Sequence, residues 1–364
     1  MKIKDIVNIV NKFAPPQLQE SYDNAGLIIG NPNDEANSVL LTIDVTEEVI
    51  DEAIKNKDAL IISHHPVIFG GIKKINGKNY TERCIIKAIQ NKIAIYAAHT
   101  NLDSIMAGVN GKICEKLNLK NTRILETKEN LLFKLVTFIP IDYLDKVRSE
   151  IFNAGAGNIG NYDSCSFNTQ GKGTFKADEQ AKPFVGEKGS FHEEEEVRFE
   201  TIFPSYLQNK IIDAMLSSHP YEEVAYDIYH LVNKNIQTGI GMIGELEKKI
   251  SETELLDTIK NIFNCKCIRH TKLLGKPVKN IAVCGGSGSY LLQKAINKGA
   301  EIFISADFKY HQFFDADNKI VIADIGHFES EQFTTEIFYD VLTKNLTNFA
   351  IHFSEVNTNP LNYY

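Results

Sequence analysis

The stretch AIKNKDALIISHHP, residues 53–66, runs from a helix-like segment through a short β-branched strand to two adjacent histidines. In a half-buried strand, neighbouring side chains point to opposite faces, so His64 and His65 could not both face one site from within it. We therefore expect the strand to end before them. Both imidazoles are then predicted at the carboxyl end of the strand.

The same stretch has a second copy in the chain. AIKNKDALIIS (53–63) aligns without gaps on AINKGAEIFIS (295–305), and NKIAIYAAH (91–99) aligns on NKIVIADIGH (318–327) with one residue inserted. The two flanks of the chain therefore read as two copies of one βαβ theme. A duplication of this kind can bring residues from opposite ends of the chain together.

Both flanks alternate strand-like and helix-length segments, which indicates an α/β fold with helices on a largely parallel sheet. The expected strands are 38–44, 59–63, 93–98, 279–286, 301–305, 319–325 and 349–353, and the expected helices are 46–57, 79–91, 251–263, 289–298 and 328–344. Sites in such folds gather at the carboxyl ends of the strands. The two histidines follow one of these ends.

The middle of the chain has another character. Its segments read strand, helix, strand, strand, helix, strand, which is the split βαβ order of a ferredoxin-like α+β unit. We therefore predict an α/β core in two halves, residues 1–125 and 239–364, interrupted by an inserted domain at 126–238. Within the insert, the charge run from His192 to Glu196 is expected to be a solvated loop edge.

Composition describes an ordinary globular protein. The chain has 364 residues, of which 43% are hydrophobic and 24% are charged, and its net charge of -8 offers no electrostatic footprint for nucleic acid. An amphipathic N-terminal helix and the lack of an 18-residue apolar run favour a cytoplasmic protein without a membrane span. The six cysteines are too sparse for a disulfide scaffold, and Cys265 and Cys267 are predicted to be strand residues.

Two histidines that follow predicted strands each have an acid four residues later: Asp103 follows His99, and Glu331 follows His327. The segment beginning HFESEQFTTEIF reads as helical, so His327 and Glu331 lie about one turn apart and can bind one ion. Together with the adjacent histidine pair, they predict a metal site, because imidazole and carboxylate suit zinc, manganese and iron. Five or six ligands exceed the needs of one open catalytic zinc, so two ions are plausible.

A structural role is the alternative for each residue. His64 and His65 could cap a strand end and bond to backbone groups. His99 could orient a neighbouring ligand or contact substrate without touching metal. His219, in the middle segment, is expected to be structural, and His311 is kept as a candidate that could reach the cleft.

The glycine-rich segments give weaker evidence for a binding site than the histidines and acids do. CGGSGS (284–289) lies between a predicted strand and a helix, so it could hold an anion on its backbone amides or simply form a tight turn. It matches neither a Walker A loop nor a dinucleotide fingerprint. Asn24 to Leu27, in SYDNAGLIIG, suggests only turn chemistry.

Six motifs, in order, resemble those of the NIF-three-like family, also called GTP cyclohydrolase I type 2 homologues. They are DNAGLIIG (23–30), ISHHPVIFGG (62–71), AAHTNLDS (97–104), CGGSGS (284–289), SADFKYH (305–311) and GHFESE (326–331). The resemblance covers nearly all of the chain. It implies a NIF-three-like duplicated α/β core with a dinuclear metal centre, an inserted PII/CutA-like domain, and a ring-shaped homohexamer whose inner cavity the metal sites face.

Carried over to this sequence, the resemblance also implies a ligand set. The implied ligands are His64, His65, Asp103, His327 and Glu331, with Glu331 bridging the two ions. His99 is implied to lie nearby without binding metal, and it is our candidate general acid or base.

Three functions compete at this point. The first is a metal-dependent hydrolase in which metal-bound hydroxide attacks a nucleotide ring, as in opening of the GTP imidazole with release of formate, or a related cyclic amide. The second is a metal-binding regulatory or scaffold protein whose insert senses a ligand. The third is a two-metal phosphoesterase. The expected partner is a small molecule, possibly a nucleotide.

Overall fold

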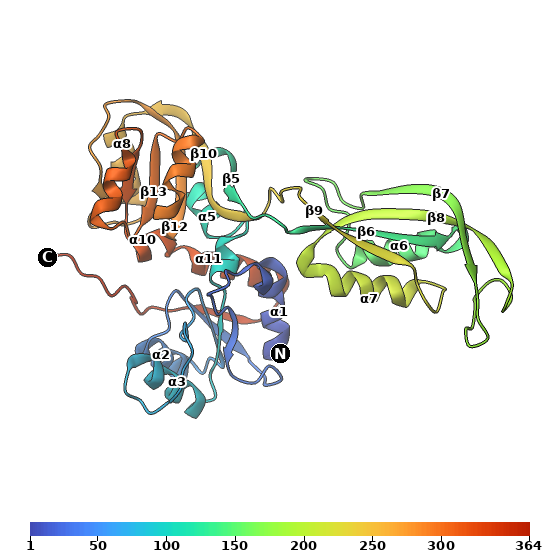
Figure 1. Cartoon of the computed structure of the whole chain (residues 1–364). Coiled ribbons are helices and arrows are strands. Elements are labelled where there is room, and N and C mark those ends of the chain that lie inside the picture. The colour runs from blue at the N-terminus through green and yellow to red at the C-terminus, as the bar shows by residue number, and fades with distance from the viewer. The chain divides into compact units, whose positions relative to one another are not determined.

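The computed structural model describes all residues from 1 to 364, and the chain divides into two units (Figure 1). Met1–Thr127 and Gln237–Tyr364 together form one unit, which we call the core unit. Lys128–Ile236 forms the other, which we call the insert. The chain thus leaves the core unit once and returns to it.

The first sheet of the core unit has five strands in the order β1-β4-β3-β2-β15. Four of them run parallel, and β1 pairs antiparallel with β4 at the edge. The strands are β1 (Gly26–Ile29), β2 (Ser38–Thr42), β3 (Leu60–Ser63), β4 (Ala94–Ala97) and β15 (Ala350–Phe353). The predicted strand at 59–63 is confirmed, and it ends at the residue before His64.

Two helices connect the parallel strands and cover one face of this sheet (Figure 1). They are α2 (Glu47–Asn56) and α3 (Tyr80–Gln90). The side chain of Thr46 accepts a hydrogen bond from the Val49 amide, and that of Asn79 accepts one from the Glu82 amide. These N-caps satisfy otherwise unpaired donors and fix where each helix begins.

The second sheet has six strands in the order β11-β14-β13-β12-β10-β5. Its strands are β5 (Lys120–Thr127), β10 (Gly239–Ile250), β11 (Arg269–His270), β12 (Val278–Ser287), β13 (Ile302–Ala306) and β14 (Val321–Asp324). Strands β12, β13 and β14 are parallel, and β11 is an antiparallel edge beside β14. Both sheets thus contain three successive parallel strands with an antiparallel strand beside the third.

The aligned segments occupy matching places in the two sheets. Residues 53–63 end α2 and form β3, while residues 295–305 end α9 (Leu292–Asn297) and form most of β13. The helices and short 3-10 turns around the second sheet are α8 (Glu252–Ile262), η4 (Ser289–Leu291), α9 and η5 (Tyr310–Ala316). The internal repeat in the sequence therefore corresponds to a repeated arrangement of elements.

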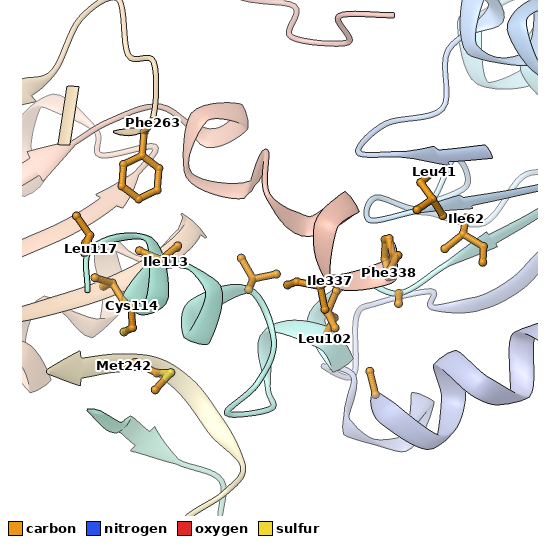
Figure 2. Close-up of a cluster of buried hydrophobic side chains, with 14 of the residues drawn as sticks. Leu41, Ile62, Leu102, Ile113, Cys114, Leu117, Met242, Phe263, Ile337 and Phe338 are labelled. Carbon is orange, nitrogen blue, oxygen red and sulfur yellow. The ribbon is translucent and has the colours of Figure 1, made fainter. Parts of the chain in front are cut away.

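One hydrophobic cluster joins the inner faces of the two sheets (Figure 2). Leu41 and Ile62 enter it from the first sheet, and Val283 and Ile304 enter it from the second. Between them lie the side chains of central helices, including the fully buried Phe338. These helices are α1 (Ile3–Phe13), α5 (Val109–Lys116) and α11 (Thr334–Asn345). Because cores are close-packed, this cluster fixes the carboxyl ends of both sheets relative to one another.

Three short elements complete the core unit. They are η1 (Pro16–Leu18), α4 (Thr100–Asp103), which follows β4, and α10 (His327–Glu331), which follows β14. Helices α4 and α10 contain the acids of the two predicted pairs. None of the helices in the structure is both long and apolar enough to cross a bilayer.

The insert is a four-stranded antiparallel sheet in the order β7-β8-β6-β9, with two helices packed on one face. Its elements are β6 (Leu132–Pro140), η2 (Ile141–Tyr143), α6 (Leu144–Asn153), β7 (Ser166–Lys176), β8 (Phe191–Pro204), η3 (Ser205–Leu207), α7 (Gln208–Ser218) and β9 (Tyr226–Leu231). Chain order and strand order are those of a βαββαβ ferredoxin-like unit, as the element pattern predicts.

Two local predictions are wrong. The acidic run from His192 to Glu196 is not a loop edge, since it lies inside β8 and pairs with β7. Glu196 is buried there and accepts a hydrogen bond from the Tyr221 hydroxyl at 2.8 Å. Cys265 and Cys267 are not strand residues, because they lie in the irregular segment between α8 and β11. For the acidic run, pairing with β7 decides the local structure, and local composition does not reveal it.

Candidate metal site

His64 and His65 follow β3 directly, at its carboxyl end. Their backbone amides both donate to the carbonyl of Ile43, at 3.1 and 2.9 Å, so the chain turns over the end of β2 at this point. Strand alternation has stopped, and the two imidazole centroids lie 4.8 Å apart. The prediction that both rings sit at a strand end is confirmed.

The carboxylate of Glu331 is the meeting point of the candidate ligands. Its Oε2 atom lies 3.6 Å from Nε2 of His64, 3.0 Å from Nε2 of His65 and 3.1 Å from Nε2 of His327. Asp103 Oδ1 lies 3.7 Å from Nε2 of His64. The five residues come from both halves of the core unit, and they converge as the sequence analysis expects.

Several atoms of this cluster have no hydrogen-bond partner although they are buried. They are Nε2 of His64, Oδ1 of Asp103 and Oε2 of Glu331. Buried polar atoms are almost always paired, because burial without a partner costs free energy. These three atoms also lie within 4.8 Å of one another. A cation among them would satisfy all three, so the side chains present fit a metal ion.

The Nδ1 atom of each imidazole already has a hydrogen-bond partner. The four Nδ1 contacts are His64 with the Ala98 carbonyl at 2.9 Å, His65 with Asp44 at 2.7 Å, His99 with Asp23 at 2.7 Å and His327 with Asp307 at 2.7 Å. Each Nδ1 can therefore donate a proton outward, and the Nε2 of a neutral imidazole then has its lone pair free for a metal ion. Metal-binding histidines are usually oriented in this way by an outer acceptor.

The electrostatics of the cluster favour positive charge. Burial opposes protonation of His65 and His327, but the surrounding carboxylates outweigh it and raise their pKa values to about 10 and about 11. Burial also opposes the ionised form of Glu331, yet the neighbouring imidazoles hold its pKa well below the usual range. Burial, reinforced by the charge of Glu331, raises the pKa of Asp103. Protons or metal cations can supply the positive charge that these acids attract.

The glycine run before α9 makes room for this cluster. Gly286 has a φ of +59°, and a Cβ atom on it would lie 2.4 Å from Oε1 of Glu331. The amides of Gly285 and Gly286 donate to Asn110 and Ser330, both at 2.9 Å. Since these donors are taken and α9 is only six residues long, close approach to Glu331 explains the glycines better than anion binding does.

His99 joins the cluster on the side of the histidine pair, because ligand atoms of His64, His65 and His99 lie within 4.8 Å of one another. Its ring centroid is 5.3 Å from those of both His64 and His65. The carboxylate of Asp23, whose side chain is fully buried, binds the His99 ring as well as the amide and hydroxyl of Thr100. Although burial opposes ionisation, these hydrogen bonds hold the pKa of Asp23 well below its usual range.

Two other histidines lie elsewhere. His219 is structural, as predicted, because its Nε2 donates to the Phe138 carbonyl at 3.0 Å and its Nδ1 accepts from the Tyr221 amide. His311 lies on η5, where its ring contacts Tyr310 and Phe314. It is not a member of any of the three ligand groups around Glu331 and the histidine pair.

Sequence reasoning missed the outer acids Asp23, Asp44 and Asp307. Two of them carried a usable signal, because Asp44 and Asp307 stand one or two residues beyond the ends of β2 and β13. Asp23 had no such signal. It lies in the SYDNAG turn, 76 residues before its partner His99.

The fold and site together define a mixed α/β protein with several sheets and a possible metal site at the strand ends. The family model described as Duf34/NIF3 (NGG1p interacting factor 3) matches residues 1–360. The chain is 37% identical over 370 residues to a Bacillus subtilis (strain 168) protein named "GTP cyclohydrolase 1 type 2 homolog", covering 99% of this chain and 98% of that protein. A Halalkalibacterium halodurans protein of the same name is 40% identical over 324 residues, covering 88% and 87%.

A solved structure supports the same family assignment. The Bacillus cereus protein described as related to NIF3 superimposes with a TM-score of 0.88 at 37% identity, covering 100% of this chain and 99% of that one. This chain belongs to the Duf34/NIF3 family. The resemblance drawn from the six motifs is confirmed.

Proposed function

We propose that this protein is a dinuclear-metal-dependent hydrolase that acts on the ring of a nucleotide or on a related cyclic amide. The observation that carries the proposal is the convergence of His64, Asp103 and Glu331, whose facing atoms are buried without partners. His65 and His327 complete the ligand set around Glu331.

Three groups of candidate ligand atoms lie close together, and two of them share the carboxylate of Glu331. His64, Asp103 and Glu331 would hold one ion, and His65, His327 and Glu331 would hold the other. Mixed imidazole and carboxylate ligation suits zinc, manganese or iron.

When bound, two divalent cations polarise a substrate oxygen and lower the pKa of water, so that a hydroxide nucleophile is available at neutral pH. The chain's own residues prepare this chemistry. Asp44 and Asp307 hold His65 and His327 with Nε2 facing the cluster. His99, with its Nδ1 held by Asp23, can accept or return a proton at Nε2 as a general acid or base.

The names of the relatives support the substrate class. Two of them are called GTP cyclohydrolase 1 type 2 homologs. We accordingly propose ring opening of the purine imidazole by water, with formate as the leaving product, as the first reaction to test. We also propose a homohexamer, on the family resemblance, and mass measurement in solution tests it.

The decisive experiment combines His64→Ala with Glu331→Gln in the full chain. We expect this variant to lose bound metal, as measured by elemental analysis, and to lose turnover of GTP, because both ligand groups are broken. His270→Ala is the matched control, since this histidine is exposed and lies outside the cluster. Retained turnover in a metal-free double variant would end the proposal.

A second candidate is a metal-binding regulatory protein whose PII/CutA-like insert senses a ligand. A cavity of about 940 Å³ in the insert favours it, lined in part by Phe138, Phe175, Phe184, Tyr221 and the buried Glu196. On this alternative, metal raises the melting temperature strongly while a broad nucleotide panel shows no chemistry. Turnover of any nucleotide in that panel would favour the hydrolase.

A further inference from the structure

Two exposed aromatic side chains lie next to the candidate metal site. Tyr22 is 62% exposed and Phe69 is 55% exposed, and their ring centroids are 6.2 Å apart. The Phe69 ring also meets His99 edge to face, at 6.0 Å and an interplanar angle of 72°. A continuous line of ring contacts therefore runs from Tyr22 through Phe69 and His99 to the histidine pair.

The backbone around these two rings is anchored. The side-chain amide of Asn24 donates to the Ile68 carbonyl at 2.7 Å, which ties the Tyr22 loop to the Phe69 loop. The Ala25 amide donates to Gln19 at 2.8 Å, and the neighbouring Asp23 is held by His99 and Thr100. The rings are thus exposed to solvent on a fixed support, an arrangement suited to a ligand.

We infer that Tyr22 and Phe69 form an aromatic wall for the planar heterocyclic ring of the substrate, in which Tyr22 stacks on the ring and Phe69, inclined at 48° to Tyr22, contacts the edge of the ring. This inference rests on the proposed function, because it places the reacting ring beside the metal ligands. It assigns ring recognition to two residues outside the ligand set. The ligand class it names is a purine or a similarly flat heteroaromatic compound.

The chemistry of the two side chains favours a flat aromatic ring at this wall. Aromatic faces bind flat π systems by stacking, and every nucleobase offers such a face. Partial burial, reinforced by nearby carboxylates that include Asp23 and Asp103, raises the pKa of the Tyr22 hydroxyl. The Tyr22 hydroxyl therefore stays protonated and uncharged at neutral pH.

A tryptophan reporter tests the wall without requiring catalysis. The chain contains no tryptophan, so Phe69→Trp in the metal-loaded protein provides a single tryptophan within the wall, which can be excited selectively at about 295 nm or longer wavelengths. We expect guanosine and GTP to quench its fluorescence and inorganic triphosphate to leave it unchanged. Phe191→Trp is the matched control, because Phe191 is 68% exposed and belongs to the insert. It should respond to none of these probes.

Binding constants provide the second measurement. Tyr22→Ala is expected to weaken guanosine binding about 5- to 150-fold, which corresponds to the loss of one base–aromatic stack. Tyr22→Phe keeps the ring and should bind like the parent protein. Metal content should be unchanged in both variants, because neither residue belongs to a ligand group.

The outcomes separate this inference from the proposed function. A Phe69→Trp protein with full metal content that guanosine and GTP do not quench overturns the aromatic wall, whether or not GTP is turned over. Equal binding by Tyr22→Ala and the parent overturns it as well. Quenching together with the Tyr22→Ala loss supports the wall, and if turnover is then absent only the hydrolase proposal fails.

Discussion

The two halves of the core unit share an arrangement but differ in what they give the site. The first half contributes two adjacent imidazoles after β3 and the carboxylate of Asp103. The second half has Asp307 directly after the matching strand β13, and it contributes His327 and Glu331 from α10. The two ligand groups that contain Glu331 each include at least one histidine of the first half, whereas the group of His64, His65 and His99 lies in the first half alone.

This difference shows how a duplicated fold can build one asymmetric site. Repetition places strand ends opposite one another, and divergence at those ends then assigns a different donor to each position. The shared carboxylate makes the halves interdependent. Substitutions in one half should therefore affect metal binding by residues of the other.

The largest effect is expected from comparing Glu331→Gln with Asp103→Asn. If Glu331 bridges both groups, its loss removes both ions, whereas loss of Asp103 removes one. We expect the parent to bind about two ions per chain and Asp103→Asn to retain about one. Elemental analysis after dialysis measures this. Equal metal loss in the two variants would contradict the bridging role, and the exposed Glu115→Gln provides the control.

Phe338→Ala tests whether the central cluster holds the two halves together. Phe338 is 1% exposed in α11, between the two sheets. We expect the free energy of unfolding to fall by about 3–5 kcal/mol, because a large cavity forms. Urea denaturation measures it, with the exposed Lys344→Ala in the same helix as control. A change below about 1 kcal/mol would show that other contacts fix the halves.

Gly286→Ala should disturb the second half locally. Gly275 makes a matched comparison, because both glycines have positive φ values, +59° and +69°, but a Cβ atom on Gly275 meets nothing within 4 Å. Gly275→Ala is expected to cost about 1–2 kcal/mol from backbone strain alone. Gly286→Ala should cost about 1–3 kcal/mol more and should reduce metal content, because it presses on Glu331. Unchanged metal content would disprove that effect.

The smallest effects are expected from the outer acids, one in each half. Asp44→Asn and Asp307→Asn each remove the charged acceptor from a histidine of the same ligand group. Each should weaken binding of one ion by about 10- to 100-fold and leave the other in place. Titration of metal into the stripped protein measures both constants. A large difference between the two variants would show that the halves support this ion unequally.

Sequence patterns were most informative where chemistry and secondary structure coincide. The sequence predicted His64 and His65 as candidate ligands because a β-branched run stops just before them. It predicted His327 and Glu331 because they stand one helical turn apart. The contact between the outer acid Asp23 and His99 could not be predicted from local sequence, because the two residues are 76 positions apart. The acidic run in β8 was misread because strand pairing depends on neighbours that local composition does not reveal.

The sequence by itself determined the α/β alternation, the internal repeat, the insert's element order and the candidate ligands. Each depends on local periodicity or on a motif of a few residues. Only the tertiary structure decided that Glu331 stands between three imidazoles and that buried atoms there lack partners. The physical reason is that these distances depend on how the central cluster packs one sheet against the other, and packing joins residues more than 260 positions apart.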